Sequence, residues 1–332
     1  MSFVLGIIVL LVKLGLVLAG LLLGAGWLTF GERRLLGWIQ IRRGPNRAGP
    51  WGLLQPMADI VKLLTKEDVT PEGADRWIFL YAPAVIAVTA LLIFAVVPFG
   101  DTLTLMGEKV PLVISDLNVG LLFVLALSSL GVYGVALGGW ASNSKFSLLG
   151  GIRATAQMIS YELSLGLSLV PVVMLTQSFS LVDIIQAQAK YPFILIQPVA
   201  FLIFFISAVA EAKRIPFDLP EAENELVAGY HTEYSGMRFG LYFLGEYVTM
   251  VVLGALIAVF FLGGWRGPLL PPVVWFLAKV TVVVFVLVWF RATFPRLRYD
   301  QLMHLGWKVL VPAALLNIVA TGGVILILHA HL

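Results

Sequence analysis

Eight long apolar segments dominate this sequence and limit the chain to one class of fold. Each is long enough to cross the hydrocarbon core of a bilayer as a helix, which takes about 20 residues. Inside that core every backbone N–H and C=O must be bonded within its own segment, so we expect each run to be an α-helix. The eight segments cover residues 3–30, 78–98, 117–138, 155–176, 193–212, 238–262, 273–291 and 306–328.

The low content of charged residues supports an integral membrane protein. Charged residues make up 12% of the 332 residues, whereas soluble domains carry about 25%. We therefore expect an all-α fold that forms a single transmembrane domain across residues 1–332. The first apolar run is too long, and lacks the preceding basic residues, to be a cleaved signal peptide.

Cysteine and histidine usage excludes several kinds of site. The chain has no cysteine and four histidines. Thiolate catalysis and cysteine-ligated iron–sulfur clusters are excluded for this chain. The scattered histidines do not suggest a haem, so we expect no metal site and no redox centre here.

The distribution of Lys and Arg predicts the orientation in the membrane. Seventeen of them fall in alternate connections between the apolar runs, and only Lys109, Lys190 and Arg266 fall in the opposite loops. Topology explains these basic residues better than nucleic-acid binding does. The positive-inside rule places the basic loops on the cytoplasmic or matrix side and both termini on the outer side. These inner loops are residues 31–77, 139–154, 211–240 and 291–306.

The first inner loop contains a helix-like apolar pattern of its own. Apolar residues recur at helical spacing between Leu53 and Leu64, with Asp59, Lys62 and Lys66 on the other face. The pattern predicts an amphipathic helix at about residues 51–66, lying in the membrane interface. A helix packed on a partner protein is the alternative.

Three glutamates lie in or at the end of apolar runs. They are Glu162, Glu211 and Glu246. A charge at mid-bilayer costs about 2.5–3.5 kcal/mol on insertion scales, so each should face the protein interior. Such carboxyls can relay protons, and a static hydrogen bond between helices is the alternative. Lys13 and Lys279 also lie within apolar runs, where we expect them to snorkel or to pair with a counter-ion.

The third inner loop is unusually acidic. Residues 210–247 contain six glutamates and Asp218. Pro220 suits the first position of a short helix, with Glu221 and Glu223 in its first turn and Glu225 on the same face as Glu221. Capping explains one or two of these acids but not all of them. A solvated acidic face is the alternative to a functional cluster.

Four motifs at the inner loops resemble one known family. They cover residues 31–67, 139–162, 210–247 and 291–308, and begin GERRLLGWIQIRRGPN, GWASNSKFSLLGG, AEAKRIPFDLPEAENE and RATFPRLRYD. Together they resemble the H-type membrane subunit of respiratory complex I, the proton-pumping NADH:quinone oxidoreductase of bacteria and mitochondria. The resemblance extends over essentially the whole chain.

The resemblance implies a fold with eight transmembrane helices, an interfacial helix and an acidic inner loop. It implies a subunit that forms a quinone chamber and its entrance and links quinone reduction to proton translocation. The expected proton path comprises Glu162, Glu211, Glu246, Glu221, Glu223 and Glu225. The expected chamber residues are Asp218, Phe217, Arg33, Arg42 and Glu32.

The same resemblance implies the partners and the location. Quinone is expected as the substrate, and FMN and iron–sulfur clusters are expected in partner subunits. Peripheral-arm subunits would carry the terminal cluster and the quinone headgroup site. Small membrane subunits and antiporter-like subunits would complete the membrane arm. The membrane would be the bacterial cytoplasmic (inner) membrane or the mitochondrial inner membrane.

Two other functions remain open at this point. A related subunit of a membrane-bound hydrogenase would keep the fold and couple hydrogen evolution to ion transfer without quinone. A stand-alone ion transporter is the other. It is weakened because the sequence has no visible inverted repeat or pair of broken helices.

Overall fold

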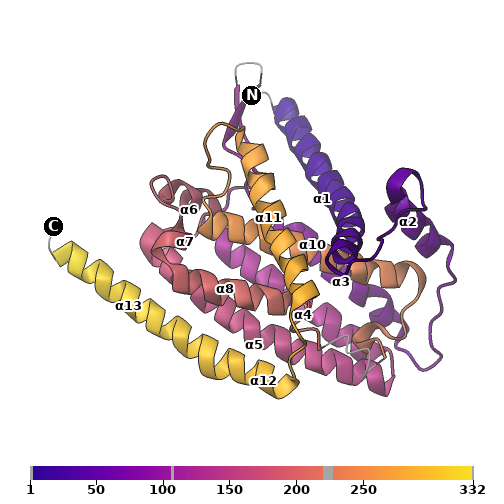
Figure 1. The fold of residues 1–332 in the computed structure, drawn as a ribbon. Coiled ribbons are helices and arrows are strands. Elements are labelled where there is room, and N and C mark those ends of the chain that lie inside the picture. The colour runs from indigo at the N-terminus through magenta and orange to yellow at the C-terminus, as the bar shows by residue number, and fades with distance from the viewer. Residues whose placement is uncertain (1–2, 106–107, 220–226, 331–332) are drawn as a thin grey trace.

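The computed structural model describes residues 3–105, 108–219 and 227–330, and these residues are mostly helical (Figure 1). Within the described residues, seven helical runs are long and apolar enough to cross a membrane. The chain is therefore a multi-pass α-helical membrane protein. The runs are α1 (Phe3–Ile39), α3 (Arg76–Ile93), α4 (Gly120–Ala141), α5 (Lys145–Thr176), α10 (Gly236–Phe261), α11 (Pro272–Thr293), and a last run formed by α12 (Tyr299–His304), a π-helical turn (Leu305–Leu310) and α13 (Val311–Ala330).

The expected span at residues 193–212 is broken. It consists of α7 (Phe193–Ile196) and α8 (Pro198–Glu211), separated by Gln197 at φ −126° and ψ 56°. Gln197 precedes a proline, which disfavours the helical conformation at that position. The 14 residues of α8 rise about 21 Å, less than the ~30 Å hydrocarbon core. The hydropathy pattern does not predict this break, and an eighth complete span stays a prediction.

Two helices begin or end well outside their expected bounds. α1 continues nine residues beyond the expected end at residue 30, so Glu32 and Arg33 belong to a helix and not to the following loop. α5 begins at Lys145 instead of residue 155, which places Glu162 near its middle. Both extensions carry polar residues, which is why a hydropathy window ended the spans too early.

The loop after α3 forms the one small sheet of the described residues. Strands β1 (Thr102–Leu105) and β2 (Glu108–Pro111) pair antiparallel, with Leu103 opposite Val110. This hairpin is an exception to the all-α expectation. A short helix, α6 (Leu181–Ala187), is capped by Ser180, whose hydroxyl accepts a hydrogen bond from the Val182 N–H.

The expected amphipathic helix is present but shorter than predicted. A 3₁₀ turn (Pro50–Gly52) precedes α2 (Gln55–Thr65). Trp51 and Gly52 both take positive φ angles, so a regular α-helix does not include them. The apolar face of α2 is largely exposed, with Met57 61% and Leu64 63% accessible. An exposed apolar face beside transmembrane helices is typical of a helix lying in the membrane interface.

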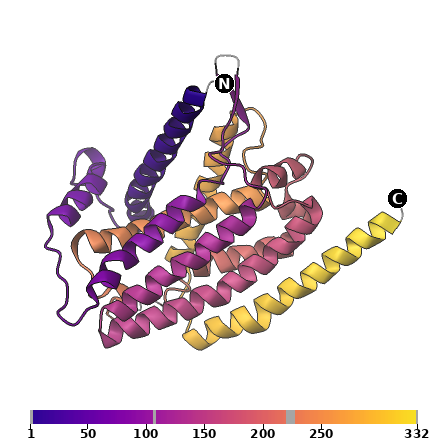
Figure 2. The same cartoon turned by 180° about the vertical axis from the view of Figure 1, so that it is seen from behind.

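Helix α10 forms the centre of the bundle. It packs against α3, α11, α1 and α8, and 78% of its most apolar stretch is buried. In Figure 2, seen from behind, α3, α4 and α5 lie side by side in front of α10, and α13 runs along α5 at the edge. The exposed residues on the outside of this bundle are mainly large and apolar, as expected for surfaces that face lipid.

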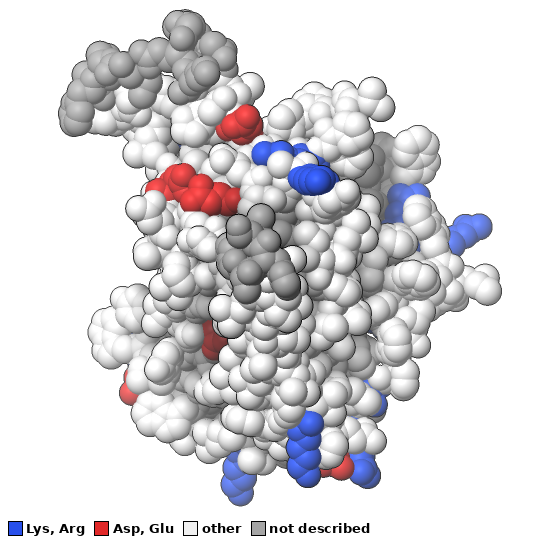
Figure 3. All heavy atoms as spheres, turned by 90° about the vertical axis from the view of Figure 1, so that its left-hand side faces the viewer, with Lys and Arg blue, Asp and Glu red and all other residues white. Residues whose placement is uncertain are grey.

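The loops separate into two groups at opposite ends of the bundle. In Figure 1 both termini, the hairpin, α6 and α7 lie toward the upper left, and α2 and α12 lie to the right and below. Figure 3, seen from the left of Figure 1, shows a broad uncharged surface with mostly basic side chains along its lower edge. The side of the membrane on which each group lies stays a prediction.

Candidate functional site

Two of the intramembrane glutamates are each hydrogen-bonded by one of two neighbouring serines. The Ser128 hydroxyl donates to the Glu211 carboxylate at 2.7 Å, and the Ser129 hydroxyl donates to Glu162 at 2.5 Å. Because the serines are adjacent on α4, they bring a carboxylate from α8 and one from α5 close together. Glu211 is buried, whereas Glu162 is half-buried and Ser129 is exposed on the side of the bundle.

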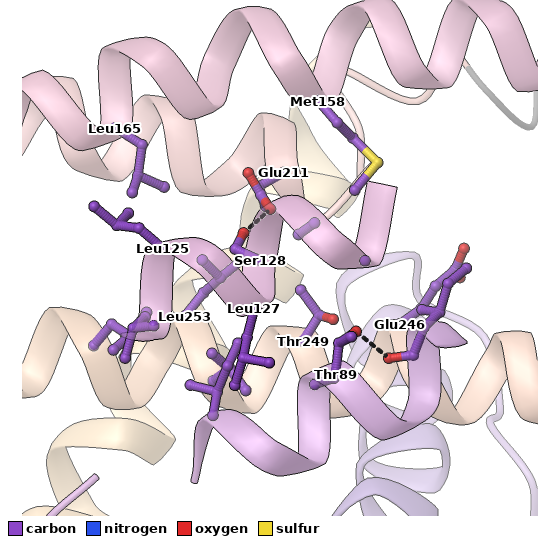
Figure 4. Close-up of a pocket in the computed structure, with 18 of the residues that line it drawn as sticks. Thr89, Leu125, Leu127, Ser128, Met158, Leu165, Glu211, Glu246, Thr249 and Leu253 are labelled. Atoms are coloured by element: carbon purple, nitrogen blue, oxygen red, sulfur yellow. Dashed lines mark hydrogen bonds between the residues drawn. The ribbon is translucent and has the colours of Figure 1, made fainter. Parts of the chain in front are cut away.

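Glu211 also lines a small internal cavity. The cavity has a volume of about 50 Å³ and is bounded by α3, α4, α5, α8 and α10. Figure 4 shows Glu211 and Glu246 reaching it from two different helices, with Ser128, Thr89 and Thr249 nearby. A water molecule needs roughly 10–15 Å³ of such space and two or more polar partners. The cavity can therefore hold a few water molecules between the two carboxylates.

Glu246 is neutralised by a residue from the loop after α8. The Lys213 ammonium lies 3.8 Å from the Glu246 carboxylate, and the Tyr230 hydroxyl donates to that carboxylate at 2.7 Å. All three side chains are buried. Tyr230 lies in the 3₁₀ turn Gly229–His231, which packs on α5 at Gly150. A Cβ at Gly150 would lie 2.7 Å from the backbone of Gly229, so this approach requires glycine.

A second buried ionic cluster surrounds Glu32 near the C-terminal end of α1. The Arg291 guanidinium bonds directly to the Glu32 carboxylate, and Arg214 lies 3.7 Å from it. The Tyr247 hydroxyl donates to the other Glu32 oxygen at 2.5 Å. Glu32 is 1% exposed, so the carboxylate is held entirely by these partners. The cluster joins α1, α10, α11 and the loop after α8.

The two clusters are linked by consecutive residues on two elements. Lys213 contacts Glu246 while Arg214 contacts Glu32. On α10, Glu246 belongs to one cluster and Tyr247 to the other. The two clusters are therefore adjacent, and two pairs of residues that are neighbours in the chain connect them.

Asp218 and Phe217 lie beside the Glu32 cluster. Burial raises the pKa of the Asp218 carboxyl, and the nearby Arg296 and Arg291 guanidiniums oppose this rise. Phe217 is buried against Tyr161, with ring centroids 5.5 Å apart, and its carbonyl accepts a hydrogen bond from the Gln157 amide. Phe217 therefore packs the loop against α5, whether or not it also lines the expected quinone chamber.

His231 lies in the same turn as Tyr230 and is not among the site residues expected from the sequence. Burial lowers the pKa of its imidazole, although the Glu246 carboxylate opposes this effect. Lowering favours the neutral form, which can both donate and accept a proton. Its side chain is 8% exposed, and its ring stacks edge-on against Tyr230 at 4.9 Å.

The remaining expected site residues lie apart from the clusters or outside the described residues. Arg33 forms an ion pair with Asp59 of α2 at 2.7 Å, and so connects α1 to the interfacial helix. Arg42 lies in the exposed loop after α1 and bonds to Gln40. Glu221, Glu223 and Glu225, with the short helix expected from Pro220, lie outside the described residues.

Several of the contacting residues are not predicted as site residues by the sequence. In the sequence, Lys213, Arg214 and Arg291 are explained as topological charges of the predicted inner loops. Tyr230, Tyr247 and the two serines have no sequence pattern that distinguishes them. A count of acids against available cations near the inner membrane boundary could have suggested the basic residues. Over the part of the chain that the structure describes, no cluster of His, Asp and Glu could hold a metal ion.

Comparisons with known proteins agree with the resemblance found in the sequence. The family described as NADH dehydrogenase matches residues 12–322. The chain is 71% identical over 321 residues to an H-type subunit of the NADH-quinone oxidoreductase of Syntrophobacter fumaroxidans, covering 97% of each chain. It is 66% identical to an H-type subunit of the Geobacter sulfurreducens enzyme over 95% of each chain. It is 60% identical to the corresponding protein of Syntrophotalea carbinolica, covering 95% of this chain and 96% of that one. The chain thus belongs to the NADH dehydrogenase family as an H-type membrane subunit of NADH-quinone oxidoreductase, the enzyme also called respiratory complex I.

Proposed function

We propose that this subunit forms the quinone chamber of the enzyme and carries the charge change of quinone reduction to a membrane-embedded proton path. The observation that carries the proposal is the pair of linked clusters. One holds Glu32 at the inner end of α1, and the other holds Glu246 beside a cavity that reaches Glu211. Buried charges are costly in a membrane protein and are usually part of ion or substrate pathways.

The Glu32 cluster is suited to respond to a reduced quinone. It contains one carboxylate and two guanidiniums, so its local charge is positive. A quinone that gains electrons without protons becomes anionic and would compete with Glu32 for Arg291 and Arg214. This competition alters the balance of charge that Asp218 experiences from Arg291 and Arg296. Electrons come from an iron–sulfur cluster in a partner subunit.

The response then passes along the chain of carboxylates. Arg214 and Lys213 are consecutive, so a shift of one guanidinium displaces the ammonium that neutralises Glu246. A less well neutralised Glu246 takes up a proton through Tyr230 or the cavity water, because an opposite charge nearby favours the ionised form and its removal does the reverse. Glu211, Ser128 and Ser129 continue the path to Glu162.

Glu162 marks where the path leaves this subunit. Ser129 and part of Glu162 lie on the apolar side of the bundle. A carboxylate facing lipid at this depth would cost about 2.5–3.5 kcal/mol. We infer that another membrane subunit, small or antiporter-like, covers this position and receives the proton. The acidic loop that contains Glu221, Glu223 and Glu225 would connect the chamber to the peripheral-arm subunits.

The entrance for the lipid-soluble quinone lies between α1, α2 and α10. Helix α2 contacts both α1 and α10, and Arg33 with Asp59 holds it to α1. Its apolar face is exposed toward the membrane. A quinone leaving the bilayer along this face would reach the Glu32 cluster directly. The relatives are named NADH-quinone oxidoreductases, which supports quinone over the hydrogen-evolving alternative.

The relatives and the charge distribution support a location and an orientation. The similar proteins reported above are bacterial, which supports the bacterial cytoplasmic membrane. The excess of Lys and Arg in alternate loops supports both termini on the periplasmic side.

The proposal is tested in the intact enzyme reconstituted in closed vesicles. NADH oxidation and proton uptake are measured together for Glu246→Gln and Glu211→Gln. We expect the number of protons translocated per NADH to fall at least twofold. Asp183→Asn is the matched control, because Asp183 accepts a hydrogen bond from Ser178 on the opposite side of the membrane. Normal reduction with normal proton stoichiometry in both glutamate variants would remove these residues from the path.

The chamber is tested separately with a photoreactive quinone analogue. We expect the cross-linked peptides to include Glu32, the residues around Asp218, or the α11 end at Arg291. Labelling confined to partner subunits, with none on these peptides, would contradict the assignment of the chamber to this chain.

A further inference from the structure

A large groove lies between α1 and α11 in the outer half of the molecule. Its volume is about 730 Å³, and it is lined mostly by apolar side chains of α1, α10, α11 and the segment between α3 and α4. Along α1 the lining runs from Lys13 to Leu28, and along α11 from Val273 to Val284. The groove is distinct from the proposed quinone entrance, because α2 contributes no residue to it.

The α1 wall of the groove has no side chains at its two glycines. Gly20 and Gly24 line the groove, and a Cβ built on either would have no neighbour within 4 Å. Only 6% of the most apolar stretch of α1 is buried. The described part of the chain thus leaves this space unfilled, although neighbouring helices elsewhere pack closely.

The outer end of the groove carries a lysine. The Lys13 ammonium donates to the carbonyls of Pro111 at 2.7 Å and Val113 at 3.2 Å. An ammonium has three N–H donors, so one remains available. Among the side chains that the structure describes, no carboxylate lies within ion-pair distance of Lys13, whose described partners are the two backbone carbonyls.

Lys13 lies at the depth of the outer membrane interface. It is 20 residues before Arg33, which marks the inner boundary. Twenty helical residues rise about 30 Å, which equals the thickness of the hydrocarbon core. Along α1 the groove extends from Lys13 to Leu28, a rise of roughly 22 Å, so it spans the outer leaflet and reaches past the middle of the core.

We propose that this groove binds an anionic phospholipid of the outer leaflet, with one acyl chain along Gly20 and Gly24 and the phosphate on Lys13. The combination of an apolar channel and a cation with a free donor at its interfacial end matches a molecule with a chain and an anionic headgroup. A partner helix is a poorer occupant, because a helix with side chains is about 10–12 Å wide. A quinone tail offers no charge for Lys13.

The test uses the intact enzyme, stripped of lipid and incubated with phosphatidylcholine vesicles that contain a minor fraction of phosphatidylglycerol. The phosphatidylglycerol carries a photoreactive group at the end of one acyl chain, and the cross-linked peptides are identified by mass spectrometry. We expect labelling on residues 16–28 and 273–284. Lys13→Gln should lower it about fivefold, as expected for loss of one cationic contact with an anionic lipid. Gly20→Leu should lower it at least as much by filling the groove.

Gly15→Leu is the matched control. Gly15 is on the same helix and also has no neighbour within 4 Å, but it does not line the groove. Its labelling should equal that of the unmodified enzyme. Equal labelling in Lys13→Gln, or equal labelling by a photoreactive phosphatidylcholine, would overturn the anionic site. A cross-link from a partner's transmembrane helix into the groove would overturn a lipid occupant.

Discussion

The two halves of the molecule, called inner and outer after the predicted orientation, differ in the groups that bind their cations. In the inner half, Lys213, Arg214 and Arg291 each approach a carboxylate. In the outer half, Lys13 bonds to two backbone carbonyls and Lys279 to three, those of Leu262, Gly264 and Arg266. Neither lysine pairs with a carboxylate of the described residues. The sequence predicts snorkelling or counter-ion pairing for both, and the observed contacts with outer-loop carbonyls correspond to snorkelling.

This difference separates charges that can respond to a reaction from charges that hold structure. A carboxylate partner can be protonated, so an ion pair changes when a neighbouring charge changes. A carbonyl partner does not titrate, so the lysine contacts stay the same through a catalytic cycle. The comparison therefore predicts that inner substitutions alter coupling and outer substitutions alter stability.

The largest effect is expected for Glu32→Gln. The substitution removes the carboxylate that Arg291 and Arg214 share, and breaking a buried pair costs about 3–5 kcal/mol. NADH:quinone reduction should fall about a hundredfold in membranes that contain assembled enzyme. Asp300→Asn is the control, because Asp300 pairs with Arg298 at an exposed position and such pairs contribute about 0–1 kcal/mol. Similar activity in both variants would show that the Glu32 cluster has no special role.

An intermediate effect of a different kind is expected for Lys279→Met. Loss of three hydrogen bonds from an ammonium should loosen the loop between α10 and α11 and destabilise it by about 2 kcal/mol. The intact enzyme should inactivate at a temperature a few degrees lower. Protons per NADH should not change, and a changed stoichiometry would contradict the distinction between the two halves.

A smaller effect is expected for Ser128→Ala. It removes a hydrogen bond to a charged group, worth about 1.5–3 kcal/mol, from Glu211. The proton-translocation rate should fall about tenfold or less. Ser207→Ala is the comparison, since Ser207 lies one turn before Glu211 on α8 and shares a neutral hydrogen bond with Ser164 of α5. Equal losses in the two variants would show that the serine at Glu211 acts only in packing.

The smallest effect is expected in the pH dependence of Asp218→Asn. Burial raises the pKa of the Asp218 carboxyl, so its ionised form is present above that pKa and is lost as pH falls through it. The activity of the unmodified enzyme should therefore decline on the acid side at a higher pH than an exposed aspartate would cause. Asp218→Asn should be less active near neutral pH and lack this acid-side step, while Asp218→Glu should keep it. An unchanged profile in Asp218→Asn would exclude the group.

Local patterns were sufficient for much of the fold. Apolar length predicted the long helices, and the spacing between Leu53 and Leu64 predicted α2. The break at Gln197 was missed although Pro198 signals it, because hydropathy alone does not register a lost helical conformation. The hairpin of β1 and β2 was missed because two four-residue strands carry too little pattern to distinguish them from a loop.

The candidate site was predicted only in part. The acids were found because carboxylates inside apolar runs stand out. Their partners were not found, because Arg291 is 259 residues from Glu32 and Ser128 is 83 residues from Glu211. No local periodicity connects positions so far apart, and an arginine near a membrane boundary fits a topological role equally well.

The sequence by itself determined that this chain is a helical membrane protein and that acids lie within its apolar runs. These follow from the cost of placing polar groups in hydrocarbon, which is a property of each segment alone. Only the tertiary structure decided which cation neutralises which acid, that two such clusters are joined through Lys213 and Arg214, and that the outer lysines bond to carbonyls instead. Those outcomes depend on how helices distant in the sequence pack, because an ion pair is effective only over a few ångströms.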